Sequence, residues 1–133
     1  MSPKKVLPTL TRVESEIMQI LWAKERATVH DVVDAMTRPV AYTTVLTILR
    51  ILEKKGYVGH EPAGGRAYVY APKVEHQKAQ RQHVRDLVER LFAGNAHDLV
   101  AGLVEEEKLS RKELEELRAK IDQRLGVTTE RKR

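Results

Sequence analysis

The chain has 133 residues, which is enough for one ordinary domain or for a small domain with an accessory element. Its 41% hydrophobic and 32% charged residues suit a soluble helical protein, and no apolar run reaches the roughly 18 residues that span a membrane. The chain lacks cysteine, which excludes disulfides, thiolate metal sites and cysteine catalysis and fits a cytoplasmic location.

The net charge of +5 lies mostly in the first half of the chain. Residues 1–73 hold eleven Lys or Arg against seven Asp or Glu, whereas residues 74–133 hold thirteen against twelve. An excess of this size is compatible with nucleic-acid binding, although many unrelated proteins share it.

Two helices are predicted before residue 40. Thr11 and Glu14 have the spacing of a capping box and open a helix expected over residues 12–23. A second helix begins at Thr28, with Asp31 in its first turn. The apolar stripes of these helices are Val13, Ile17, Ile20 and Leu21, followed by Val29, Val32, Val33 and Met36.

The stretch from Ala41 to Gly56 predicts a third helix with two different faces. Gly56 ends this helix, and Lys54 and Lys55 lie at its negative end. One face is apolar and requires a core, whereas the other carries small hydroxyls and an arginine that allow close approach to a polar surface. The apolar face is Val45, Ile48, Leu49 and Leu52, and the polar face is Thr43, Thr44, Thr47 and Arg50.

A β-hairpin is predicted directly after the third helix. Residues 57–61 and 66–70 are expected to be its strands, and the turn chemistry of Pro62-Ala63-Gly64-Gly65 joins them. We interpret Tyr68 and Tyr70 as core residues. Three helices followed by a hairpin predict a winged helix-turn-helix.

Residues 74–133 predict three amphipathic helices with narrow apolar stripes. The first is expected over about 74–93 and ends at Gly94-Asn95, and the last opens at the capping box of Ser110 and Glu113. Such stripes cannot easily bury one another within one chain, so a second copy is the simplest partner. The positions expected at this dimer interface are Leu87, Leu91, Leu99, Leu103, Leu117 and Ile121.

The predicted fold class is therefore mainly α, a winged helix-turn-helix followed by a C-terminal helical dimerisation region. We expect a DNA-binding domain over residues 1–73, a helical dimerisation domain over 74–126 and a basic, disordered tail over 127–133.

Catalytic and metal chemistry find little support. His76 and His83 are seven residues apart and could share a helix face, but no third ligand stands at helical spacing, so surface histidines are the simpler interpretation. The acidic run 105–107 is typical of a solvated helix end. The sequence predicts no enzyme, no metal site and no cofactor.

The threonine-rich face of the third helix is the strongest functional signal. Threonine is a mediocre helix former, and a plain solvated face would more often carry Glu and Lys. Its hydroxyl and methyl suit contact with DNA base edges, including the thymine methyl. An arginine in the wing would reach phosphate or the minor groove. The predicted DNA contacts are Tyr42, Thr43, Thr44, Leu46, Thr47, Arg50, Lys54, Lys55 and Arg66, with peripheral core as the alternative for Leu46.

Several motifs, taken in order, carry a resemblance to a known family. They are Glu14…Ile17-Met18…Leu21-Trp22, Ala41-Tyr42-Thr43-Thr44-Val45 with Thr47, Lys54-Lys55-Gly56-Tyr57, Arg66-Ala67-Tyr68-Val69-Tyr70-Ala71-Pro72, and Leu99-Val100 with Val104-Glu105 and Leu109-Ser110. Over residues 9–125 the chain resembles the penicillinase-repressor family, the BlaI/MecI type of winged-helix repressor. The resemblance implies a homodimer on a palindromic operator and, in the β-lactam branch, a membrane sensor whose signalling leads to cleavage of the repressor.

Two departures from the family pattern bear on regulation. The cleaved bond in the β-lactam branch joins asparagine to phenylalanine, and the matching positions here are Gly102 and Leu103, which argues against the same proteolytic release. The copper branch has a cysteine-rich tail, which this chain lacks. The open alternatives are a winged helix used as a protein-interaction module and a repressor that senses a small molecule.

Overall fold

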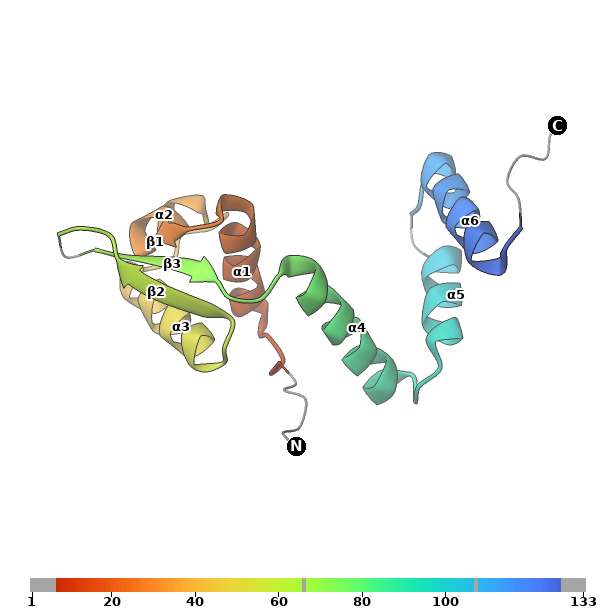
Figure 1. Cartoon of the computed structure of the whole chain (residues 1–133), viewed down its shortest axis with the longest axis horizontal. Coiled ribbons are helices and arrows are strands. Elements are labelled where there is room, and N and C mark those ends of the chain that lie inside the picture. The colour runs from red at the N-terminus through yellow and green to blue at the C-terminus, as the bar shows by residue number, and fades with distance from the viewer. Residues whose placement is uncertain (1–6, 66, 107, 128–133) are drawn as a thin grey trace. The chain divides into compact units, whose positions relative to one another are not determined.

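The structure is a computed structural model that describes residues 7–65, 67–106 and 108–127. The chain divides into two compact units, Met1–Asp86 and Leu87–Arg133. The described part of the first unit contains three helices, a small antiparallel sheet and the start of a fourth helix (Figure 1). These elements are α1 (Arg12–Lys24), β1 (Ala27–Thr28), α2 (Val29–Ala35), α3 (Tyr42–Lys54), β2 (Val58–Pro62), β3 (Tyr68–Pro72) and α4 (His76–Leu91).

Side-chain caps set where α1 and α2 begin. The Thr11 and Thr28 side chains each accept a hydrogen bond from the backbone N–H three residues later. The carboxylates of Glu14 and Asp31 in turn accept from the backbone N–H of Thr11 and Thr28. Each reciprocal pair satisfies two N–H groups that the first helical turn leaves without partners. The predicted capping box at Thr11 is confirmed, and the predicted helix start at Thr28 is also a capping box. The three helices predicted before the hairpin are confirmed.

The sheet has the strand order β1-β3-β2 among the described residues. Ala27 of β1 pairs with Tyr70, and His60 of β2 pairs with Tyr70 from the other side. The strands of the hairpin begin one and two residues later than predicted. Sequence reasoning missed β1, because a two-residue strand shows no alternation and is defined only by its pairing with β3.

The core of the first unit lies between the sheet and the helices. The predicted apolar stripe of α3 enters this core, where Val45, Leu49 and Leu52 are fully buried. Burial of each such side chain contributes about 1.5–3 kcal/mol relative to leaving it exposed. The other fully buried side chains of the unit are Ile17, Met18, Leu21, Val32, Tyr57 and Val58.

The two tyrosines of β3 differ in burial. Tyr70 is buried as predicted, but Tyr68 is 49% exposed, so its interpretation as a core residue is wrong. The two residues lie on the same face of the strand, since side chains alternate with a period of two. Tyr68 pairs with Pro62 toward the tip of the hairpin, where it lines an open groove instead of the core.

The described part of the second unit is helical. It contains the end of α4, then α5 (Ala96–Glu106) and α6 (Arg111–Leu125). Ser110 caps α6 through the predicted capping box, and Gly126 ends the helix with a positive φ of 81°. No described residue of α5 or α6 is buried, so the predicted apolar stripes of these helices are open in the single chain.

The predicted domain limits stay a prediction, because α4 runs across the boundary between the compact units. The predicted tail falls, except for Val127, outside the described residues. Within the described ranges, no helix is both long enough and apolar enough to cross a membrane. The same ranges hold no group of three or more His, Asp or Glu side chains that could hold a metal ion.

Candidate nucleic-acid interface

The polar face of α3 is exposed as the apolar stripe requires. Because Val45 and Leu49 are buried on one face of the helix, the side chains on the opposite side of the helical wheel must point outward. Leu46 is half-buried and packs against the core cluster, in the peripheral-core position given above as its alternative. The exposed polar and aromatic side chains of this face are Tyr42, Thr43, Thr44, Thr47, Arg50 and Lys54.

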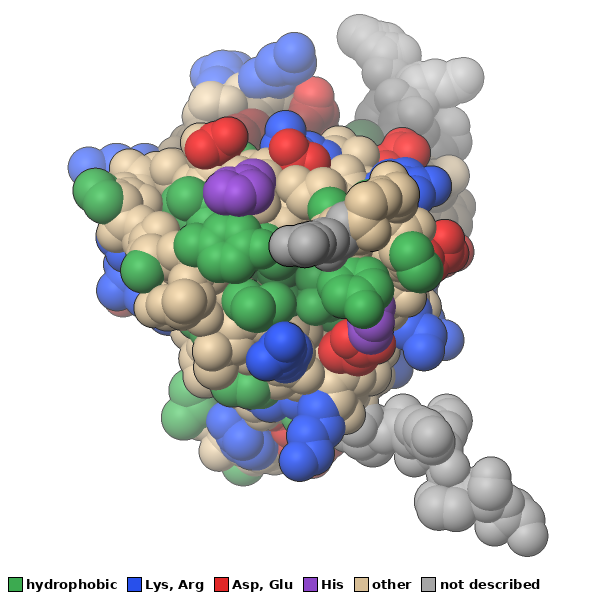
Figure 2. Space-filling view, turned by 90° about the vertical axis from the view of Figure 1, so that its left-hand side faces the viewer, with side chains coloured by type: hydrophobic (Ala, Val, Ile, Leu, Met, Phe, Trp, Pro, Cys, Tyr) green, Lys and Arg blue, Asp and Glu red, His purple; other side chains and the backbone are tan. Residues whose placement is uncertain are grey.

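A groove of about 480 Å³ runs beside this face, between α3, the start of α2 and the hairpin. Tyr42 and Arg50 line it from α3, and His60 and Tyr68 line it from the hairpin. Figure 2 looks onto this end of the unit and shows hydrophobic side chains gathered at its centre, with histidine beside them and both basic and acidic side chains around them. The surface is therefore concave and partly aromatic, and its lining carries both Arg50 and Glu53.

Two histidines of the groove were not predicted as site residues. The ring of His30 lies 4.7 Å from that of Tyr42, and His60 meets Tyr68 edge to face at 4.8 Å. His60 Nδ1 also lies 2.8 Å from a carboxylate oxygen of Glu53. No sequence spacing joins these residues, because they come from α2, α3 and both strands of the hairpin.

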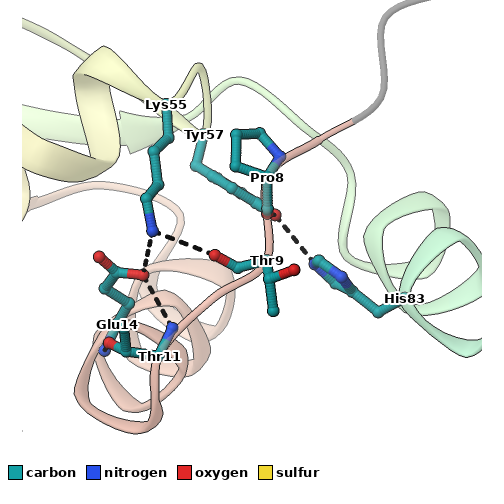
Figure 3. Close-up of polar contacts among 7 residues, drawn as sticks. All are labelled: Pro8, Thr9, Thr11, Glu14, Lys55, Tyr57 and His83. Carbon is teal, nitrogen blue, oxygen red and sulfur yellow. Dashed lines mark hydrogen bonds and ion pairs between the residues drawn. The ribbon is translucent and has the colours of Figure 1, made fainter. Parts of the chain in front are cut away.

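Lys55 is already engaged inside the unit. Its Nζ lies 2.7 Å from Oε1 of Glu14 and 3.0 Å from the carbonyl oxygen of Thr9, and its side chain is only 24% exposed (Figure 3). Lys55 is therefore held by two acceptors of the first unit, whereas Lys54 is exposed. Arg66, the predicted wing contact, lies outside the described residues.

Burial alone would raise the pKa of Glu14, but hydrogen bonds from Lys55 and Thr11 and the charge of Lys55 outweigh it. The pKa of Glu14 is therefore lower than its ordinary value of 4.5. Burial, together with the nearby Glu14 charge, raises the pKa of Tyr57 to about 12. Tyr57 is consequently protonated at neutral pH and can act as a hydrogen-bond donor.

The Tyr57 hydroxyl joins three segments of the first unit (Figure 3). It donates its one proton to the carbonyl oxygen of Pro8, since that oxygen can only accept. His83 Nε2, at 2.9 Å, must then carry a hydrogen and donate to the Tyr57 oxygen. The segment before α1, the turn after α3 and the middle of α4 are thereby held together.

The predicted dimerisation positions are mostly open to solvent. Leu91 is the most exposed of them at 73%, and Leu99 alone among them is half-buried. Gly102 and Leu103, the counterparts of the family's cleaved bond, lie within α5. The other exposed dimerisation positions are Leu87, Leu103, Leu117 and Ile121.

Three helices and a hairpin wing, with an exposed polar face on the third helix, define a winged-helix protein. The penicillinase repressor family model matches residues 10–123 of the chain. The chain therefore belongs to the penicillinase repressor family of transcriptional repressors, and the predicted BlaI/MecI resemblance is confirmed.

Individual relatives agree with this assignment. The methicillin resistance regulatory protein MecI of Mammaliicoccus sciuri is 28% identical over 111 residues, which cover 82% of this chain and 89% of the relative. The penicillinase repressor of Bacillus licheniformis is 25% identical over 115 residues, covering 85% and 89%. The chain is also similar to the solution structure of the DNA-binding domain of the repressor BlaI, at 28% identity over 55% of this chain and 90% of that one, with a TM-score of 0.48.

Proposed function

We propose that this protein is a dimeric, sequence-specific DNA-binding transcriptional repressor that recognises a palindromic operator. The observation that carries this proposal is the exposed face of Thr43, Thr44 and Thr47 on α3, in a family of repressors. A helix whose outward side chains are short can enter the major groove of DNA closely and present hydroxyls and methyls to base edges.

The proposed contacts divide into base readout and backbone positioning. Thr44 and Thr47 read base edges, with Thr43 and Tyr42 beside them, while Arg50 and Lys54 neutralise phosphates. Leu46 lies at the edge of this surface, and Arg66 is the proposed contact from the wing. We omit Lys55 from the set, because its ion pair with Glu14 gives it a structural role at the end of α3.

The dimer is proposed from the open apolar faces of the second unit. Side chains such as Leu91 and Ile121 are exposed in the single chain, and burying apolar area stabilises association. A symmetric pair also suits a palindrome, since two recognition helices must sit about 34–36 Å apart to enter successive major grooves on one side of DNA.

Cleavage between Gly102 and Leu103 has no place in this mechanism. The pair differs from the family's asparagine–phenylalanine bond, and in the structure it lies inside α5. A bond within a helix is a poor protease substrate, because cleavage concentrates at exposed loops and termini. We therefore propose that release of the operator depends on a signal other than cleavage of this bond.

The proposal is tested by measuring binding of the full chain to its own promoter DNA and to a scrambled duplex at two salt concentrations. Neutralising several phosphates releases counterions, so we expect affinity to fall steeply as salt rises, with a clear preference for the promoter. Equal and salt-insensitive binding to both duplexes would contradict the repressor function. A protein-interaction module would give that result.

A further inference from the structure

A second groove, of about 630 Å³, lies between α1 and α4 within the first unit. Its volume is in the range of small-molecule sites, about 300–1,000 Å³. Leu10, Trp22, Ala79 and Val84 contribute apolar surface to its lining. The groove is separate from the face of α3 that we assign to DNA, with which it shares no lining residue.

One wall of this groove is held in place by contacts of Trp22. The indole Nε1 donates to the carbonyl oxygen of Val74 at 2.8 Å, and the ring stacks on His76 with centroids 4.4 Å apart. Ala79 is buried on the facing helix. The start of α4 is thus fixed against α1, so an apolar surface is formed without a ligand.

The formally charged side chains that line this groove are both arginines. Arg81 and Arg85, one turn apart on α4, line it, and no carboxylate is among its lining residues. Neither arginine belongs to an ion pair of the described residues. Two nearby carboxylates of α1 are already engaged, Glu14 with Lys55 and Glu16 with Arg38. The groove therefore combines an apolar wall with two arginines and no carboxylate in its lining.

We propose that the α1–α4 groove binds an amphipathic organic anion. Its hydrocarbon or aromatic body packs on Trp22, Leu10 and Val84, and its anionic head group lies between Arg81 and Arg85. Guanidinium groups bind carboxylates through short charge-assisted hydrogen bonds. Ser15 and Gln19 of α1 add polar groups at the edge of the groove.

The groove reaches the contact that anchors α3. His83 lines it, and its Nε2 donates to the hydroxyl of Tyr57, three residues after the end of α3. A bound anion is therefore adjacent to that anchor. Ligand binding itself depends only on the geometry of the first unit, so its test is independent of operator binding.

The test uses the fluorescence of Trp22, which is the single tryptophan of the chain. The full-length protein is titrated with octanoate, octylammonium and 1-octanol, which share one alkyl chain and differ in charge. We expect saturable change of the Trp22 emission with octanoate, at roughly tenfold higher affinity than with 1-octanol, and none with octylammonium. Equal responses to the three compounds, or no response to octanoate, would overturn the proposal.

Substitutions of Arg81 and Arg85 test whether these side chains bind the carboxylate of octanoate. The double change Arg81→Gln and Arg85→Gln is expected to weaken octanoate binding roughly tenfold and to leave 1-octanol unaffected. The matched control, Arg118→Gln with Arg124→Gln on exposed α6, removes the same charge and should bind octanoate as the original chain does. Ser15→Glu, which places a carboxylate opposite the arginines, should also weaken binding. Unchanged octanoate affinity in both groove variants would contradict the assigned site.

A second copy of the chain is the competing occupant of an apolar groove. Dilution through the dimer dissociation range, followed by Trp22 emission and analytical ultracentrifugation together, separates the two cases. If the Trp22 emission changes with the dimer fraction but not with octanoate, the partner chain occupies the groove and the proposal is overturned. Emission that is constant on dilution and responsive to octanoate supports it.

Discussion

Helices α3 and α6 carry similar apolar stripes but differ in how those stripes are covered. The stripe of α3 is buried at Val45, Leu49 and Leu52, whereas α6 has no buried residue among those described. An amphipathic pattern predicts a helix and its apolar face, but it does not say which surface covers that face. The apolar face of α3 is covered by the core of its own unit, whereas the apolar face of α6 remains available to a partner.

The largest effect is expected from substitutions in the apolar face of α6, which we propose as part of the dimer interface. Leu117→Asp with Ile121→Asp would bury unpaired charges in the dimer seam, at about 3–5 kcal/mol for each charge. We expect the full chain to become monomeric in sedimentation experiments. The circular dichroism of the variant should stay helical, because both side chains are exposed in the single chain. A dimer of undiminished affinity would show that α6 is not in the interface.

The corresponding change in α3 tests its buried stripe. Leu49→Ala removes a fully buried side chain and leaves a cavity, so we expect the free energy of unfolding to fall by about 2–5 kcal/mol. Leu117→Ala, measured in chemical denaturation of the dilute monomer, should change it by about 0.5 kcal/mol or less. Equal losses at the two positions would remove the distinction between a covered and an uncovered stripe.

The polar face of α3 is expected to act on specificity more than on stability. Thr44→Ala with Thr47→Ala should reduce operator binding by about 1–3 kcal/mol for each lost base contact, with little change in non-specific binding. Thr37→Ala, an exposed threonine outside α3, is the matched control. Unchanged operator preference in the double variant would mean that a different face reads DNA.

The smallest expected effect concerns the ion pair of Glu14 and Lys55. Because the pKa of Glu14 is lowered in the folded protein, its contribution is fully present above the ordinary value of 4.5 and is lost as pH falls through the folded value. We expect Glu14→Gln to flatten the acid limb of a plot of unfolding free energy against pH. A plot of unchanged shape would show that Glu14 is not linked to folding.

Much of the local structure could be predicted because its causes are local. The capping boxes at Thr11, Thr28 and Ser110 each span four residues, and all three open helices in the structure. The polar face of α3 could be predicted for the same reason, since it is the complement of an apolar stripe on one helix. Its role in binding DNA stays a prediction.

Contacts between residues that are distant in the chain could not be predicted in this way. Lys55 was predicted as a DNA contact from its place at a helix end, and its ion pair with Glu14, 41 positions earlier, was not predicted. Tyr68 was assigned to the core from its strand pattern, yet the helices do not cover that end of the hairpin groove. In both cases the sequence pattern predicted the correct helix or strand, but it did not predict which residues the side chain contacts.

The sequence by itself determined the order of elements, their caps and the outward face of α3, because propensity, capping and periodicity act over a few residues. Only the tertiary structure decided the pairing of β1 with β3, the engagement of Lys55 and the groove between α1 and α4. Each of these depends on contacts between segments tens of residues apart. Such contacts follow from the packing of the whole unit, which no local pattern encodes.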